Sequence, residues 1–165
     1  MSLDLYIISK KPVKHKCTGI YIRENGQTRE LSLEEAKKLY PNDNITEITL
    51  EDHIYWHDNI THNLGTMADH CYCQCPDKIS LHSILWRPEE TTLLTVSGKL
   101  TPSYTKALSV CLDELKEHRS YYEKFNPENS CGDYVTLVNF AESLLEALNK
   151  IPNEEYNNYI IEASR

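Results

Sequence analysis

The sequence predicts a single α+β domain over residues 1–165, in which an N-terminal antiparallel sheet with a hairpin packs against two long C-terminal helices. Three observations favour this fold class. Apolar and polar residues alternate along parts of the N-terminal third, as they do in half-buried strands. An Asn-Gly dipeptide marks a tight hairpin turn. Two long stretches of the C-terminal half have apolar residues at helical spacing.

The first elements expected along the chain are a strand, a hairpin and a short helix. Residues 3–8 alternate between apolar and wetter positions, which is the period of a strand with one solvated face. The hairpin spans 19–31, where two β-prone segments flank the Asn-Gly pair. Ser32 and Glu35 have the spacing of a capping box, so a short helix is expected to begin there. It should end near Tyr40, before a proline.

Another strand and two long helices are expected further along. Residues 45–54 alternate between apolar and polar types, which is compatible with a strand. A long amphipathic helix is predicted from Thr101-Pro102, an N-cap followed by a first-turn proline, to the residue before Pro127. A second helix is predicted over 133–150, with its apolar residues facing inward. The tail 156–163 alternates weakly, which allows it to return to the sheet as a strand.

Composition excludes several classes of function. With 17 Lys and Arg against 25 Asp and Glu, the formal net charge is −8. Such a surface repels the phosphates of nucleic acid polymers and of anionic membranes. The five glycines form no Gly-x-Gly pair, so the dinucleotide-binding pattern is absent, and so is the P-loop. The His-Glu-x-x-His and Gly-x-Ser-x-Gly motifs are missing too, which excludes most common enzyme signatures.

Cysteine usage and hydropathy favour a cytoplasmic protein. The first eight residues lack the basic start and the long apolar run of a signal peptide. No stretch approaches the roughly 18 apolar residues of a membrane helix, so no membrane association is expected. Six cysteines in the cytoplasm are expected to be free thiols or metal ligands rather than disulfides.

Positive charge is concentrated near the N-terminus. Residues 1–40 carry eight Lys and Arg against five Asp and Glu, a net +3, so the remaining residues sum to −11. Much of the excess comes from the run Lys10, Lys11, Lys14, His15 and Lys16. Such a run is usually a solvated loop. The alternative is a rim that attracts an anionic small ligand.

The densest polar chemistry lies in residues 56–68, which combine a tryptophan with histidines, asparagines and threonines. Amides and imidazoles need hydrogen-bond partners, and a ligand could supply them if the segment lines a pocket, where the tryptophan would offer a flat face for stacking. The predicted ligand-binding residues of this segment are Trp56, Asn59, Thr61, His62 and Asn63. The alternative is a helix start, with Asn59 or Thr61 as N-cap and with Leu64 and Met67 on the buried side.

Arg87 completes the set of predicted ligand-binding residues. It follows Trp86 and precedes Pro88, which favours an extended backbone at the arginine. Its guanidinium group could bind a phosphate or carboxylate through two hydrogen bonds. It could equally pair with Glu89 or with an acidic residue on a helix.

No metal and no cofactor are predicted, although two clusters invite a metal interpretation. The first contains His53, His57 and His62 together with Asp52 and Asp58. The second is the Cys-rich stretch 70–76, whose distant partners would be His82, Cys111 and Cys131. Structural zinc sites usually combine two closely spaced ligand pairs. Neither cluster offers a convincing set of four ligands.

Several blocks of the chain resemble a family of small, functionally uncharacterised proteins from bacteriophage and prophage genomes. The blocks are SLDLY at 2–6, NITHNL at 59–64, MA at 67–68, LWRPE at 85–89, NPEN at 126–129 with Gly132 and Tyr134, and SR at 164–165. The resemblance spans most of the chain. In the family a short Ala/Gly-rich stretch stands where this chain has 69–81, so the cysteine run is a departure and is not expected to carry the main function.

The resemblance implies a setting rather than an established activity. A small phage protein of this kind would act on host machinery in the cytoplasm of an infected or lysogenic bacterium. One class of phage proteins sequesters or degrades nucleotide-derived immune signals of the host. By analogy, we expect this chain to bind and sequester a small anionic nucleotide-type ligand, in an anti-defence role.

Two other functions stay open at this point. The chain could be a hydrolase of such a ligand, with His62 as general base and with His57 or Asp58 assisting. It could instead be an inhibitor that covers a host protein with its acidic helical surface. A homo-oligomer is also left open.

Overall fold

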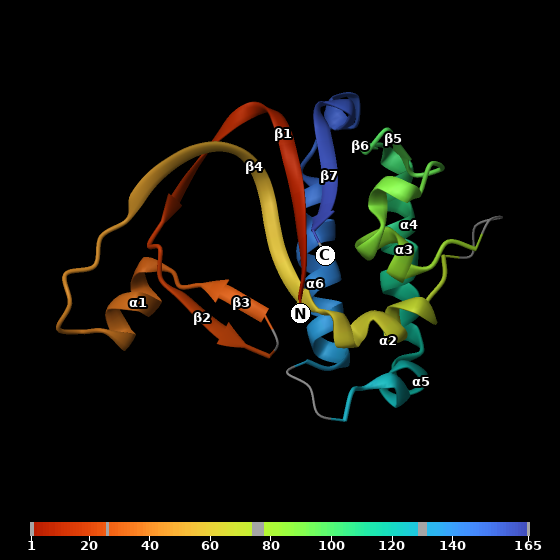
Figure 1. Ribbon diagram of the computed structural model, residues 1–165, viewed down its shortest axis with the longest axis horizontal. Coiled ribbons are helices and arrows are strands. Elements are labelled where there is room, and N and C mark those ends of the chain that lie inside the picture. Colours follow the sequence, from red (N-terminus) through yellow and green to blue (C-terminus); the bar gives the residue numbers. More distant parts are fainter. Residues whose placement is uncertain (1, 26, 74–77, 129–131, 165) are drawn as a thin grey trace.

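The computed structural model (Figure 1) describes residues 2–25, 27–73, 78–128 and 132–164. It confirms the predicted α+β class, because the described strands form an antiparallel sheet in the order β4-β1-β7-β6-β5 and a separate hairpin sheet that pairs β2 with β3. The strand bounds are β1 Ser2–Cys17, β2 Tyr21–Glu24, β3 Gln27–Glu30, β4 Ile48–Thr61, β5 Thr95–Val96, β6 Lys99–Leu100 and β7 Tyr159–Ser164.

The two long helices predicted for the C-terminal half are α4 and α6. Helix α6 passes behind the sheet, and α3 and α4 lie beside it (Figure 1). The helix bounds are α1 Leu33–Leu39, α2 Gly65–Asp69, α3 Leu81–Trp86, α4 Pro102–Glu117, α5 Arg119–Tyr122 and α6 Tyr134–Asn149, with the 3-10 turns η1 His62–Leu64, η2 Pro88–Glu90, η3 Glu123–Phe125 and η4 Asn153–Asn158. In the part of the chain that the structure describes, no helix has both the length and the apolar character needed to cross a membrane.

The alternation of residue types along β1 gives the strand one buried face and one partly exposed face. Leu3, Leu5 and Ile7 are fully buried, whereas the residues between them are partly exposed. The buried face joins one core with apolar residues of the helices, among them Leu108 and Leu144. Burial of one such side chain contributes about 1.5–3 kcal/mol to stability, so the alternation of this short segment fixes which face of the sheet the helices cover.

A β-bulge at Tyr55 interrupts β4. Ile8 of β1 pairs with Ile54, but Ile7 pairs with Trp56, so Tyr55 is an extra residue on β4. One extra residue reverses the alternation of faces on either side of it. As a result the neighbouring side chains of Tyr55 and Trp56 both contact α6.

Beyond the sheet, β1 and β4 continue as a two-stranded ribbon that arches away and carries the β2–β3 hairpin and α1 (Figure 1). The basic run 10–16 lies in this part of β1 and not in a loop. The predicted hairpin is confirmed, with Asn25 at φ 50°, while Gly26 lies outside the described residues. The capping box of Ser32 and Glu35 is confirmed as well, and α1 ends before Tyr40.

The long helix expected from Thr101 is divided. Helix α4 ends before His118, whose backbone is not helical (φ −115°, ψ 40°), and α5 and η3 follow. Carbonyl groups in the last turn of a helix lack intrahelical partners. The hydroxyl of Tyr134 donates to one of them, the carbonyl oxygen of Leu115, at 2.7 Å. A tertiary contact from α6 therefore stabilises the break.

The predicted C-terminal strand is confirmed. Strand β7 lies between β1 and β6 and is antiparallel to both. The turn between β5 and β6 has positive φ at Ser97 (52°) and Gly98 (78°), as a type I′ hairpin turn requires. This turn sets Lys99 opposite Ile160 of β7.

Candidate functional site

A hollow of about 570 Å³ lies between the β2–β3 hairpin and the β1–β4 ribbon. We call it the hairpin hollow. Its walls come from the end of β1 (15–17), from the hairpin (Tyr21 and 28–30) and from the stretch of β4 between Leu50 and Asn59. The hairpin itself forms one wall, so the hollow exists only because the hairpin folds back toward β4.

The structure divides the predicted ligand-binding residues into two groups. Trp56 and Asn59 line the hairpin hollow, together with His57 and Asp58, the two residues considered as helpers in hydrolysis. The remaining predicted residues, Thr61, His62, Asn63 and Arg87, do not line it.

Asn59 ties the hairpin to β4. The backbone N–H of Thr28 donates to Oδ1 of Asn59 at 3.0 Å, and Nδ2 of Asn59 donates to the carbonyl oxygen of Thr28 at 3.3 Å. The side-chain amide of Gln27 adds a bond of 3.2 Å to the backbone carbonyl of Asn59. Because Asn59 is only 7% exposed and its amide is used in this way, its place in the site is to hold the hairpin wall.

Trp56 forms part of the wall opposite the hairpin. Its indole N–H donates to the hydroxyl of Ser143 on α6 at 3.1 Å, and its ring meets Phe140 edge to face, with centroids 5.7 Å apart. These contacts fix the indole against the core. Trp56 remains partly exposed, and it is among the residues that line the hollow.

His57 projects from the face of the sheet opposite the core. It stacks on Tyr6 with ring centroids 4.3 Å apart, and its Nε2 lies 3.2 Å from Oδ1 of Asp4. Tyr6 and Asp4 are on the partner strand β1, where Tyr6 is directly opposite His57. The imidazole is therefore held by cross-strand neighbours at the border of the hollow.

The acidic residues of the hairpin hollow have different environments. A hydrogen bond from the backbone N–H of Ile54 lowers the pKa of Asp52, and His15, whose Nε2 is 3.0 Å from Oδ1 of Asp52, lowers it further. Burial raises the pKa of Asp58, against the opposing effects of the Asn59 N–H and of His57. Asp58 is therefore a partly desolvated carboxyl group at the wall of the hollow.

Residues of the hairpin and of β1 complete the hollow, and the sequence did not single them out as one site. Tyr21 is 60% exposed and lines it, as do Lys16 and Arg29. Arg29 is held by Glu24 and Glu35 at 3.3 and 2.9 Å. The basic run that includes Lys16 was the available signal, because its alternative interpretation was a rim for an anionic ligand.

Three residues of the second group, Thr61, His62 and Asn63, lie at a helix start, as the alternative interpretation proposed. The hydroxyl of Thr61 accepts from the backbone N–H of Asn63 at 3.3 Å and caps η1. Leu64 and Met67 are fully buried. The side chain of Asn63 is exposed.

His62 contacts Trp86 of α3. Its Nδ1 accepts from the indole N–H of Trp86 at 2.9 Å. The ring of His82 stacks on that of Trp86, with centroids 5.1 Å apart. A Cβ at Gly65 would lie 3.4 Å from the imidazole of His82, which is an ordinary van der Waals distance. Trp86 is thus a partner of His62 that the sequence did not indicate.

Arg87 is exposed and pairs with Glu90 at 3.4 Å. The expected pairing with a nearby acid therefore occurs, although the partner is Glu90 and not Glu89. An exposed ion pair of this kind contributes about 0–1 kcal/mol, so it holds the guanidinium group of Arg87 only weakly.

The histidines of the first metal candidate do not converge. His53 contacts the carbonyl oxygen of Ser9 through Nδ1 at 2.9 Å, whereas His57 contacts Asp4 and His62 contacts Trp86. The bulge at Tyr55 explains part of this, because it places His53 and His57 on opposite faces of β4.

The described cysteines of the second metal candidate are buried, whereas His70 is exposed. Cys71, Cys73 and Cys111 are all in the core, and the Cys71 thiol donates to the carbonyl oxygen of Cys111 at 3.3 Å. Cys75 and Cys131 lie outside the described residues. Within the part of the chain that the structure describes, the sulfur atoms of Cys71, Cys73 and Cys111 do not all lie within 4.8 Å of one another.

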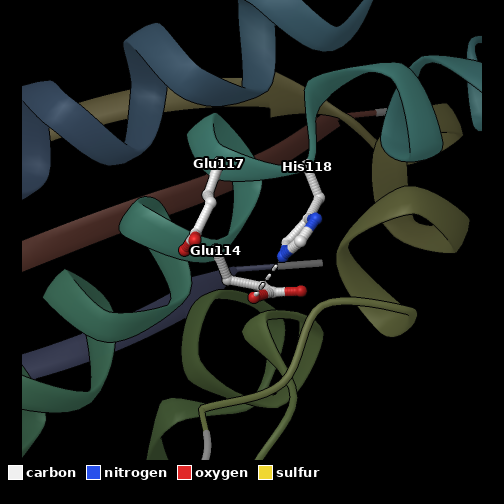
Figure 2. A group of neighbouring side chains, drawn as sticks. All are labelled: Glu114, Glu117 and His118. Atoms are coloured by element: carbon white, nitrogen blue, oxygen red, sulfur yellow. Dashed lines mark ion pairs between the residues drawn. The ribbon is translucent and has the colours of Figure 1, made fainter.

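One such group does exist among the described residues, at the end of α4 (Figure 2). The possible ligand atoms of Glu114, Glu117 and His118 all lie within 4.8 Å of one another. Glu114 also accepts from the hydroxyl of Tyr122 at 3.0 Å, and its other oxygen lies 3.7 Å from His118. The spacing i, i+3, i+4 on a predicted helix was the signal for this group. Two of its three members are exposed, so solvent competes for every ligand position.

No protein-family model matches the chain, and neither a curated protein nor a solved structure shows significant similarity to it.

Proposed function

We propose that the chain binds a small anionic nucleotide-type ligand in the hairpin hollow and thereby sequesters it. The observation that supports this function is the make-up of the hollow. It combines three aromatic side chains, Tyr21, Tyr55 and Trp56, with two basic ones, Lys16 and Arg29. A volume of about 570 Å³ is within the range of small-molecule sites.

The aromatic rings would hold the base. A purine or pyrimidine stacks on any exposed aromatic face, and such a contact is worth about 1–3 kcal/mol. Tyr21 is the most accessible of the three rings, since it is 60% exposed whereas Tyr55 and Trp56 are partly buried. The partly desolvated Asp58 lies on the same wall as Trp56 and can accept a hydrogen bond from an amino group of the base.

The charges would hold the phosphate. Lys16 carries positive charge at the hollow, Arg29 shares its charge with Glu24 and Glu35, and His15 and His57 border the hollow. Three acids line the hollow as well, but two are engaged. Asp52 pairs with His15, and Glu30 accepts from the backbone N–H of Thr18 at 2.8 Å.

Binding is favoured over the hydrolase alternative by the position of His62. The residue proposed as general base does not line the hollow, and its Nδ1 is engaged by Trp86. A general base must lie within hydrogen-bonding distance of the proton that it removes. In keeping with the resemblance to phage proteins, we take the ligand to be a nucleotide immune signal of a bacterial host.

Incubation with a panel of linear and cyclic mono- and dinucleotides tests the proposal. The protein is freed of unbound nucleotide, heated, and the released compound is identified by mass spectrometry. We expect one nucleotide class to be retained and returned intact. Return of a cleaved nucleotide would favour the hydrolase, and retention of none would contradict the proposal in favour of a protein-binding inhibitor, to be tested by pulldown from a host lysate.

Matched variants locate the binding. We expect Lys16→Gln and Tyr21→Ala each to weaken nucleotide binding about tenfold, which corresponds to about 1.4 kcal/mol. Lys38→Gln and Tyr40→Ala make the same changes at exposed positions outside the hollow and should leave the affinity unchanged. An equal loss in all four variants would contradict the assignment of the hairpin hollow.

A further inference from the structure

A second, separate pocket of about 250 Å³ lies where β1, β6, β7 and η4 meet. It shares no lining residue with the hairpin hollow. Its apolar part consists of Ile8 and Ile160, which face each other across β1 and β7. Its polar part consists of two lysines, two asparagines and a serine.

The fold brings the two lysines together from distant parts of the chain. Lys99 follows the type I′ turn and pairs with Ile160. Lys10 follows the segment of β1 in which Ile8 pairs with the same Ile160. Lys99 is therefore directly opposite Ile160, Lys10 lies two residues after Ile8, and both lysines line the pocket.

The charge of this pocket is opposite to that of the whole chain. The formal net charge is −8, yet the described residues that line the pocket include no Asp or Glu. Neither Lys10 nor Lys99 forms an ion pair with another described residue. Two ammonium groups at one pocket repel each other, and a bound anion would remove that repulsion.

The remaining polar groups are also able to donate hydrogen bonds. The side-chain amides of Asn157 and Asn158 line the pocket from η4. Ser9 is only 6% exposed, and its oxygen accepts from the backbone N–H of Lys11 at 3.2 Å. The hydroxyl keeps its own hydrogen to donate. Donors therefore come from β1, β6 and η4 around one small space.

We propose that this pocket is a binding site for a phosphate group, free or carried by a small molecule. Five donor side chains suit a tetrahedral anion with several acceptor oxygens, and lysine is a common point-charge partner of phosphate. Ile8 is partly buried and lines the pocket together with Ile160, which is 36% exposed, so part of the lining is apolar. The site stands independently of the function proposed for the hairpin hollow.

Isothermal titration with inorganic phosphate tests this site, with chloride at matched ionic strength in the reference buffer. We expect saturable binding to the wild-type protein that is stronger than binding of acetate. Lys10→Gln and Lys99→Gln should each weaken phosphate binding about tenfold or more, since a charge-assisted hydrogen bond is worth about 1.5–3 kcal/mol. Both lysines are exposed, so the variants should fold, which circular dichroism verifies.

Two matched variants serve as controls. Lys106→Gln removes an exposed lysine from α4 and should bind phosphate as the wild type does. Lys16→Gln, in the hairpin hollow, separates the two sites, because it can affect phosphate bound in that hollow but not phosphate bound beside Lys10 and Lys99. No saturable phosphate binding, or undiminished binding by Lys10→Gln and Lys99→Gln, would overturn the proposal. Loss of phosphate binding only in Lys16→Gln would overturn it too, because the anion would then bind in the hairpin hollow.

Discussion

The indole N–H of Trp86 donates a hydrogen bond of 2.9 Å to Nδ1 of His62. An indole N–H can only donate, so Nδ1 of His62 is the acceptor and the hydrogen of the neutral imidazole lies on Nε2. Trp86 is only 3% exposed, which leaves its N–H little access to water. This bond links η1, at the end of β4, to α3.

We expect His62→Ala to destabilise the protein because it leaves the Trp86 N–H without its acceptor. An unpaired buried donor costs about 1–3 kcal/mol, so the melting temperature should fall by several degrees. Thermal unfolding followed by circular dichroism measures the change. Asn63→Ala, an exposed neighbouring position, is the control and should melt close to the wild type. Equal melting temperatures for His62→Ala and the wild type would refute a structural role for the bond.

We expect Asp58→Asn to stabilise the protein at pH 7. Burial raises the pKa of Asp58 above the ordinary value of 3.8 in the folded state, so the folded protein binds this proton more tightly than the unfolded chain. Stability from this group is then fully present below pH 3.8 and is lost as the pH rises through the folded pKa. At pH 7 the ionised carboxylate is unfavourable, and asparagine removes that cost. The gain should shrink as the pH falls toward 3.8.

Asp52→Asn is the matched control with the opposite sign. The Ile54 N–H and His15 lower the pKa of Asp52, so its contribution to stability is present above pH 3.8 and is lost as the pH falls through the folded pKa. This variant should therefore be less stable than the wild type at pH 7. Melting temperatures of both variants, measured across about pH 3–7, test these predictions. A change in melting temperature of the same sign in both variants at pH 7 would contradict the opposite pKa shifts of Asp58 and Asp52.

Local features of the fold could be predicted from the sequence because their causes are local. The Asn-Gly turn, the capping box that begins at Ser32 and the apolar spacing of α6 each depend on residues within a few positions. The bulge at Tyr55 and the break at His118 could not be predicted. Each is stabilised by a side chain or strand that is distant in sequence. At the break, for example, Tyr134 of α6 donates to the carbonyl oxygen of Leu115 in the last turn of α4.

The candidate site was predictable only in part, for the same reason. Trp56 and Asn59 were found from the polar block and both line the hairpin hollow. Tyr21 and Arg29 could not be assigned to it, because the hairpin closes on β4 through the amide of Asn59, a contact between residues far apart in sequence. Lys10 and Lys99 likewise line one pocket because β1 and β6 both lie beside β7 in the sheet, an order that local sequence does not indicate.

We expect Tyr134→Phe to weaken the junction between α4 and α5. The change removes the hydrogen bond from the hydroxyl to the carbonyl oxygen of Leu115, and both residues are buried. The expected loss is about 1 kcal/mol in the free energy of unfolding. Urea denaturation measures it. Tyr121→Phe, at an exposed ring nearby, should leave the unfolding midpoint unchanged, and equal effects in both variants would contradict the proposed role.

We expect no stoichiometric metal in the purified protein. The strongest ligand group among the described residues is Glu114, Glu117 and His118, and it is largely exposed, with Glu114 already accepting from Tyr122. Elemental analysis after gel filtration measures the metal content, and added Zn²⁺ should not shift the melting temperature. One zinc per chain that disappears in His118→Ala would show that this group binds metal and that the expectation is wrong.

We expect Asn59→Ala to loosen the hairpin while the main sheet stays folded. The variant loses the two hydrogen bonds that join the Asn59 amide to the backbone of Thr28, although the bond from Gln27 to the backbone of residue 59 can persist. Because Thr28 is exposed, water can replace the lost partners, and the cost should be about 1 kcal/mol. Hydrogen exchange should quicken at the Thr28 amide and remain slow in the buried part of β1.

Asn139→Ala, at an exposed position on α6, is the control and should change neither exchange rate. Since the hairpin is one wall of the hollow, nucleotide binding should weaken in Asn59→Ala, and full affinity together with rapid Thr28 exchange would show that the hairpin wall is not needed for the ligand.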